Sequence, residues 1–170
     1  MKKNRSIISI LKKDFYRWNS SSFIKLYLTK IEFRLVWRYR WCNYFKTKII
    51  FKPIYYCERF LYHKTCIKAG CDIPSSVSIG AGFMIIHTWG IVINSKAEIG
   101  DDFTILTGSV IGANEHGVPK IKNNVFCGAH SLIIGNVVVE DNAKIGAGAI
   151  VTKNVTRNSV VCNSPAKKIK

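Results

Sequence analysis

The chain has few of the features by which secreted, zinc-binding or membrane-spanning proteins are recognised. None of its six cysteines forms a Cys-x-x-Cys pair, which argues against a zinc site. The N-terminus has an apolar run of only six residues before more lysines, too short for a cleavable signal sequence. No segment approaches the ~18 uncharged apolar residues of a spanning helix. We therefore expect reduced thiols in a cytoplasmic protein.

Acidic residues are scarce in the first part of the chain. Residues 1–70 contain 17 Lys and Arg against three acidic residues, a net charge of +14, whereas residues 71–170 contain nine against seven, a net charge of +2. The basic character therefore belongs to the N-terminal part. Because no recognised nucleic-acid motif accompanies it, we do not expect nucleic acid as a partner.

From residue 71 onward the chain has a six-residue period. A helix would show a spacing of 3.6 residues and a β-meander would show alternation, so neither explains this pattern. The period shifts by two residues after Ile91 and is interrupted after Ile111. Apolar anchors recur six residues apart, namely Ile73, Ile79, Ile85 and Ile91; Ile93, Ile99, Ile105 and Ile111; and Ile121, Cys127, Ile133, Val139, Ile145 and Val151.

Such a repeat of strand and turn predicts a β-solenoid. Three repeats make one coil of about 18 residues, and successive coils stack at the ordinary interstrand spacing of about 4.8 Å. The anchors fill the interior, and small residues after them fit the corners. Between Ile111 and Ile121 about four extra residues, around 114–117, must form a loop that projects from the solenoid.

Several ordered stretches of this repeat resemble the hexapeptide-repeat acetyltransferases, in the branch shared by serine acetyltransferases and colanic-acid-type exopolysaccharide O-acetyltransferases. The resemblance covers roughly residues 70–170. It implies a mainly β fold, a left-handed parallel β-helix, which here follows an N-terminal α-helical segment. It also implies a homotrimer and acetyl-CoA as co-substrate, bound between neighbouring solenoids. The matching stretches are Asp72-Ile-Pro, Ile79-Gly-Ala-Gly, Ile86-His-Thr-Trp-Gly, His116-Gly-Val-Pro-Lys, Gly128-Ala, Ile145-Gly-Ala-Gly-Ala and Ser164-Pro-Ala-Lys.

The resemblance assigns the catalytic base to His87 and its acidic partner to Asp72. Imidazole can accept a hydroxyl proton near neutral pH, and a carboxylate on its other nitrogen fixes the tautomer. His87 follows Asp72 by 15 positions, which is three fewer than one coil of about 18 residues. Their side chains can therefore meet across adjacent layers. His116, in the projecting loop, matches a histidine that helps to bind the acceptor. His130 is expected only as a surface turn residue beside the cofactor groove.

The same resemblance assigns the cofactor-binding residues. Gly128, Ala129, Ala147 and Gly148 match positions along which acetyl-CoA lies, and the basic side chains of Lys144 and Lys153 are candidates for contact with its phosphates. Small residues are also what the corners of a solenoid require, so each of the four has a purely structural explanation too. No metal is expected, because the spacing of the histidines does not resemble the three-histidine site of solenoidal carbonic anhydrases.

The acceptor is predicted from a departure at position 86. Serine acetyltransferases usually have an aspartate there that can hold the serine amino group, and this chain has Ile86. We therefore expect Ile86 and Trp89 to contact a sugar hydroxyl of a surface polysaccharide or its lipid-linked precursor. Serine acetyltransferase is the alternative, and a non-catalytic solenoid scaffold is the alternative of another class.

Residues 1–70 are expected to be a separate helical segment, and residues 71–170 the acyltransferase domain. The stretch 23–41 lacks Gly and Pro and is predicted to be helical, and 49–62 is a second apolar run with Pro53 near its start. Two uses of this segment remain open. Its aromatic residues, among them Trp18, Tyr27, Trp37 and Trp41, suit peripheral contact with the headgroups of an anionic membrane at its inner face, or they pack helices that cap the first coil.

Overall fold

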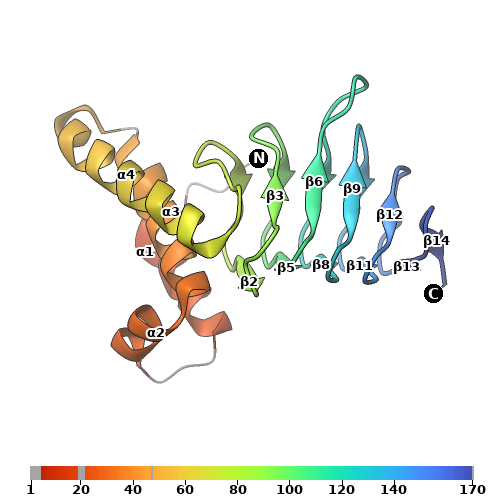
Figure 1. Cartoon of the computed structure of the whole chain (residues 1–170), viewed down its shortest axis with the longest axis horizontal. Coiled ribbons are helices and arrows are strands. Elements are labelled where there is room, and N and C mark those ends of the chain that lie inside the picture. Colours follow the sequence, from red (N-terminus) through yellow and green to blue (C-terminus); the bar gives the residue numbers. More distant parts are fainter. Residues whose placement is uncertain (1–4, 19–21, 47, 170) are drawn as a thin grey trace.

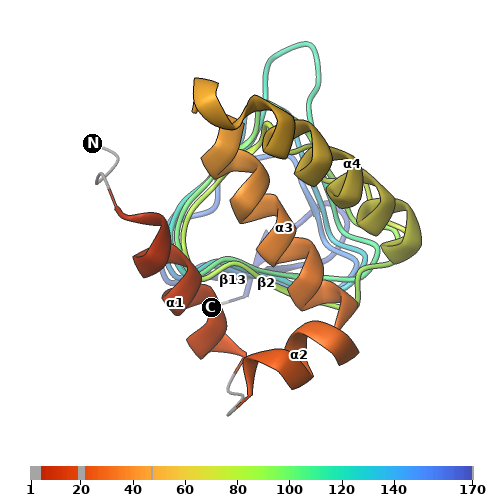
Figure 2. The ribbon, with the colours of Figure 1, turned by 90° about the vertical axis from the view of Figure 1, so that its left-hand side faces the viewer.

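Helices cover one end of a three-sided β-solenoid in the computed structural model, which we describe for residues 5–18, 22–46 and 48–169 (Figure 1). The helical segment comprises α1 (Ile7–Arg17), α2 (Phe23–Thr29), α3 (Ile31–Lys46), a short 3-10 helix η1 (Ile49–Phe51) and α4 (Lys52–Ala69). The solenoid runs from there to the other end of the molecule. A view along its axis shows the triangular cross-section (Figure 2).

The solenoid has three parallel faces, each built from one short strand per coil. Face 1 contains β1 (Ser78–Ile79), β4 (Glu98–Ile99), β7 (Lys120–Ile121) and β10 (Val138–Val139). Face 2 contains β2 (Met84–Ile86), β5 (Thr104–Leu106), β8 (Phe126–Cys127), β11 (Lys144–Ile145) and β13 (Val160–Cys162), with β14 (Lys167–Lys168) added antiparallel at its end. Face 3 contains β3 (Val92–Ile93), β6 (Val110–Gly112), β9 (Leu132–Ile134) and β12 (Ile150–Val151).

The anchors predicted from the six-residue period fill the interior. Every anchor from Ile73 to Val151 is buried, and so are side chains that stand four positions after an anchor, such as Ala97, Val125 and Ala143. Residues Phe126 and Lys144 are partners across one coil, so that coil takes the expected 18 residues. The coil from Met84 to Thr104 takes 20 and the coil from Glu98 to Lys120 takes 22. These longer coils hold the two-residue shift and the projecting loop.

The helical segment caps the first coil and shares its core. Tyr39 of α3 donates a hydrogen bond to the carbonyl of Val77 at 2.6 Å, and Tyr62 of α4 donates one to Ile73 at 2.6 Å. Leu35, Val36 and Ala69 belong to the same apolar cluster as the solenoid interior. These contacts show that the helical segment caps the first coil, which is one of the two uses that the sequence left open.

The structure refines the sequence-based account of the helices at two points. The stretch 23–41 is helical as predicted, but it is divided into α2 and α3 because Lys30 adopts an extended conformation that ends α2. The aromatic residues proposed for membrane headgroups are half-buried and pack on one another, as in the ring contacts of Phe23 with Trp37 (centroids 4.6 Å apart) and of Trp18 with Phe33 (5.9 Å). No helix of the described ranges is long and apolar enough to cross a membrane.

Candidate active site

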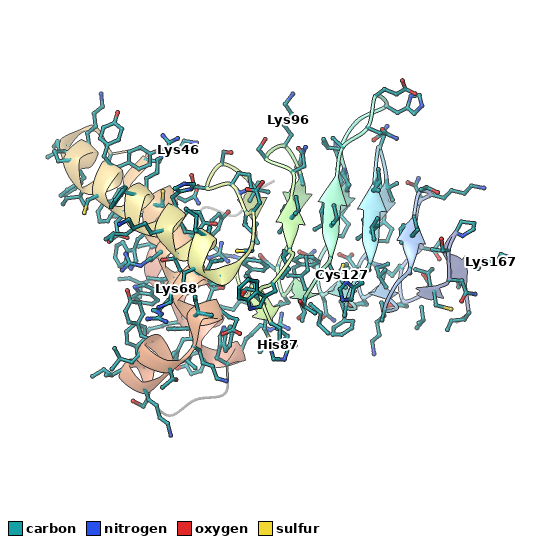
Figure 3. The ribbon with its side chains drawn as sticks, viewed as in Figure 1. Lys46, Lys68, His87, Lys96, Cys127 and Lys167 are labelled. Atoms are coloured by element: carbon teal, nitrogen blue, oxygen red, sulfur yellow. The ribbon has the colours of Figure 1, made fainter. Side chains whose placement is uncertain are left out.

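His87 stands at the corner between faces 2 and 3, in the coil that is next to the helices. The corner of this coil has five residues, 87–91, between β2 and β3, whereas the next coil has three, 107–109, between β5 and β6. His87 has a left-handed conformation (φ 58°) and projects outward, as Figure 3 shows. Its side chain is exposed. We call this edge, with the equivalent turns of later coils, the His87 corner.

Trp89 and Gly90 hold this enlarged corner to the layers on both sides. The carbonyl of Trp89 accepts hydrogen bonds from the backbone N–H of Gly108 at 2.8 Å and from the hydroxyl of Thr107 at 2.7 Å. The N–H of Gly90 donates to the carbonyl of Gly70 at 2.8 Å. The ring of Trp89 lies against Gly70 and remains 69% exposed. An exposed aromatic face therefore stands beside His87.

Asp72 lies on the layer before His87 and is tied to the same corner through its backbone. Its N–H donates to the carbonyl of Ile91 at 2.8 Å, and its carbonyl accepts the N–H of Ile93 at 2.9 Å. Asp72 thus pairs with Val92, and its side chain is exposed. Among the described residues the His87 and Asp72 side chains share one edge but form no hydrogen bond with each other, so the dyad stays a prediction.

The small residues assigned to acetyl-CoA lie on the same corner as His87. Gly128 and Ala129 form this corner in the coil of β8 and β9, and Ala147 and Gly148 form it in the coil of β11 and β12. Gly148 donates a backbone hydrogen bond to Ala129 at 2.8 Å, and a Cβ added to Gly148 would meet nothing within 4 Å. The backbone is therefore accessible to a ligand at Ala147 and Gly148, whereas Gly128 is buried and a Cβ there would come within 2.6 Å of the Ala147 nitrogen.

His116 and Lys153 lie on a different corner, between faces 3 and 1. The loop with His116 connects β6 to β7 and is the highest projection in Figure 1. The His116 side chain is 73% exposed, and its Nε2 lies 3.4 Å from a Glu115 carboxylate oxygen. Within one chain the structure therefore does not bring His116 to His87.

The two lysines have different surroundings. Lys144 is exposed on β11 of face 2, beside the His87 corner. Lys153 lines a hollow of about 360 Å³ at the last coils, together with Lys167 and Lys168. A cluster of three basic side chains suits the phosphates of a cofactor that runs toward this end. The described part of the chain contains no group of three His, Cys, Asp or Glu side chains that could hold a metal.

His130, which the sequence predicted only as a surface turn residue beside the cofactor groove, is an exposed turn residue on the His87 corner. Its backbone is left-handed (φ 56°), and its N–H donates to the carbonyl of Thr107 at 2.9 Å. The equivalent left-handed positions in the coils on either side are Gly108 and Gly148. The imidazole lies against Gly108, where a Cβ would come within 2.2 Å of its Nδ1. The sequence feature that marks His130 is therefore the replacement of a glycine at a position where the neighbouring coils have Gly108 and Gly148.

Ile86 is the residue directly before His87 on β2, and its side chain is 36% exposed. It points outward beside the equally outward Leu106, its register partner on β5. The surface that flanks His87 on face 2 is therefore apolar. No carboxylate occupies this position.

The chain is similar to serine acetyltransferases both in sequence and in fold. No family model matches the chain. The serine acetyltransferase of Helicobacter pylori is 35% identical over 124 residues, which cover 69% of this chain and 71% of that protein. Other curated serine acetyltransferases match over only 41–46% of their own length, so the chain spans less than half of those relatives.

Solved structures agree with this relationship along nearly the whole chain. A serine acetyltransferase of Neisseria gonorrhoeae in complex with serine superposes with a TM-score of 0.80 at 26% identity, covering 96% of this chain and 69% of that one. A serine acetyltransferase in complex with CoA superposes with a TM-score of 0.79 at 26% identity, covering 99% and 71%. The solenoid is thus the left-handed parallel β-helix that the family resemblance implied, and the chain belongs to the serine acetyltransferase family.

Proposed function

We propose that the chain transfers an acetyl group from acetyl-CoA to a hydroxyl group, with His87 as the general base. The observation that carries this proposal is the shared corner. The exposed imidazole of His87 and the exposed residues Ala147 and Gly148 lie along one edge of a chain that belongs to an acetyltransferase family.

The corner suggests direct transfer between two bound substrates. The acceptor oxygen attacks the thioester carbonyl carbon while a ring nitrogen of His87 takes the hydroxyl proton. The carbon–sulfur bond then breaks, and the proton passes from the imidazolium to the leaving thiolate. Asp72 on the adjacent layer would stabilise the imidazolium and fix its tautomer. No acyl-enzyme is needed.

L-Serine is the first acceptor to test. The relatives in the comparison are serine acetyltransferases, and one superposed structure holds serine. They favour the acceptor that the sequence pattern ranks second, and none of them supports polysaccharide acetylation. The corresponding role would be in cysteine biosynthesis.

A sugar hydroxyl is the second candidate, and Ile86 is the observation that favours it. An exposed apolar side chain beside the base gives no counter-charge to the ammonium group of serine. Trp89, with its ring 69% exposed, offers a flat apolar surface on which a sugar ring can stack. A non-catalytic scaffold is the alternative from another class.

We further propose that the chain acts as a homotrimer. Outward side chains on the two faces that meet at the His87 corner are largely apolar, as with Ile86, Phe126 and Val92, whereas face 1 presents Glu98 and Lys120. Burial of these apolar faces between copies would also exclude water from His87 and bring the His116 loop of a second copy toward it. Light scattering of the purified chain measures the assembly mass.

The direct test is release of CoA from acetyl-CoA, measured with L-serine and with a panel of free and lipid-linked sugars. We expect one acceptor class to support turnover. His87→Ala should lower that rate by about 10²–10⁴-fold, the usual contribution of a general base. The matched control is His63→Ala, because His63 is an exposed histidine on α4, away from the corner.

Two results would contradict the proposal. Full activity in the His87→Ala variant would remove the mechanism. A failure of the wild-type chain to bind CoA in calorimetry would favour the scaffold alternative.

A further inference from the structure

Helix α4 ends in a motif that brings two cysteines together. Gly70 has a left-handed conformation (φ 64°), the N–H of Cys71 donates to the carbonyl of Cys66 at 3.1 Å, and the N–H of Gly70 donates to that of Ile67 at 3.1 Å. These are the two hydrogen bonds of a Schellman motif. The motif places the side chain after the glycine against the side chain five positions earlier, usually as an apolar contact. In this chain both positions are cysteine.

The Cys71 thiol is turned toward Cys66. Its Sγ lies 3.9 Å from the carbonyl oxygen of Cys66, to which it donates a hydrogen bond. Interaction with the neighbouring Cys71 thiol is the main cause that lowers the pKa of the Cys66 thiol, and it outweighs the opposing effect of burial. Cys66 is buried, whereas Cys71 is half-buried and reachable from solvent. A small oxidant can therefore reach the pair.

The three residues from Gly70 to Asp72 hold the His87 corner in place. The carbonyl of Gly70 accepts the N–H of Gly90, and the ring of Trp89 lies against Gly70. Asp72 exchanges backbone hydrogen bonds with the residues on both sides of Val92. Cys71 is the residue between these two attachment points. A displacement of Cys71 is transmitted through the backbone to both of them.

We propose that Cys66 and Cys71 are a redox-sensitive pair that controls the geometry of the His87 corner. A hydroperoxide oxidises the two thiols to a disulfide. With hydrogen peroxide, the two thiols lose two protons and two electrons, one sulfur–sulfur bond forms, the oxygen–oxygen bond breaks, and two waters are released. A sulfur–sulfur bond is about 2.05 Å long, much shorter than a thiol–thiol contact, so closure draws Cys71 toward α4. Asp72 and Trp89 then shift relative to His87.

The experiment uses the full chain, treated with hydrogen peroxide and then with an alkylating reagent. Peptide mapping is expected to find Cys66 and Cys71 joined and lighter by two hydrogen atoms. The rate of CoA release, a readout that rests on the proposed function, should fall at least tenfold and return after dithiothreitol. Cys71→Ser and Cys66→Ser should each keep their activity under peroxide. Cys57→Ser, which removes an exposed thiol of the same helix, should respond like the wild type.

A structural readout separates failure of this proposal from failure of the proposed function. The ring-proton NMR signal of His87, assigned by its loss in His87→Gln, should move on oxidation even if no acceptor supports turnover. Alkylation of both cysteines after peroxide treatment would overturn the proposal. So would a mapped Cys66–Cys71 disulfide that leaves both the His87 signal and any measured turnover unchanged.

Discussion

Ile86 separates the two acceptor candidates by a single side chain. Replacement by aspartate, Ile86→Asp, places a carboxylate beside His87 at a position that is 36% exposed. A charge-assisted contact with an ammonium group contributes about 1.5–3 kcal/mol, so kcat/KM for L-serine should rise about tenfold or more. Ile86→Asn has a similar size without the charge and should give no such rise. Equal effects of the two variants in the CoA-release assay would show that charge at this position is irrelevant.

The six-residue period predicts which corner of the solenoid a candidate residue occupies, provided that the residue lies in a regular part of the repeat. Gly128 and Gly148 follow the face 2 anchors Cys127 and Ile145 by one and three residues, so the period alone places both at the corner after face 2. His87 needed the family resemblance, because it stands in the two-residue shift where the period is broken. His116 and Lys153 follow face 3 anchors, and that phase already places them on another corner. Their grouping with His87 came from the resemblance and requires a second chain.

At the scale of elements, α1 is held to the solenoid by a buried ion pair. Asp14 is 2% exposed and Arg40 is 5% exposed, and their side chains are joined by two hydrogen bonds of 2.7 and 3.1 Å. Asp14 also accepts the backbone N–H groups of Gly82 and Phe83 at 2.7 and 3.0 Å, while Arg40 donates to the carbonyl of Ile79 at 2.7 Å. One carboxylate thus connects two helices and the first coil.

Asp14→Ala should destabilise the helical cap by about 3–5 kcal/mol, because it leaves a buried guanidinium without its partner and two backbone donors unsatisfied. Urea denaturation followed by the helical circular-dichroism signal measures this loss. Glu58 pairs with Arg38 and is more exposed than Asp14. Glu58→Ala should therefore lower the free energy of unfolding by at most about 1 kcal/mol. A similar loss in both variants would mean that Asp14 does not anchor the cap.

The same contacts explain why sequence predicted the solenoid better than the helices. Successive coils have similar residue types at equivalent positions, so a window of six residues is enough to recognise the repeat. The position of α1 depends instead on Asp14 meeting Arg40 and Gly82, which are distant in sequence. The end of α2 at Lys30 has no glycine or proline to mark it. The position of α1 and the end of α2 depend on tertiary contacts, which local sequence patterns do not reveal.

At the scale of the whole molecule, charge and exposed apolar surface coincide at one end. Residues 1–70 carry a net charge of +14, and residues 71–170 carry +2. On α4 the side chains of Tyr56, Phe60 and Ile67 are 58–66% exposed, and they alternate with exposed Lys64 and Lys68. We propose this mixed face of α4, in place of the packed tryptophans, as a surface that contacts an anionic membrane.

The purified chain should therefore sediment with vesicles that contain phosphatidylserine and remain in solution with purely phosphatidylcholine vesicles. Each basic residue near an anionic surface contributes roughly 1 kcal/mol, and this attraction weakens as added salt shortens the Debye length. The double variant Lys64→Glu and Lys68→Glu should abolish sedimentation at physiological salt. Lys96→Glu with Lys122→Glu changes the net charge equally, but on exposed positions of the solenoid, and should retain it. Equal losses in the two double variants would mean that the vesicles respond to total charge, and failure of the wild type to sediment even at low salt would leave capping as the single use of the helical segment.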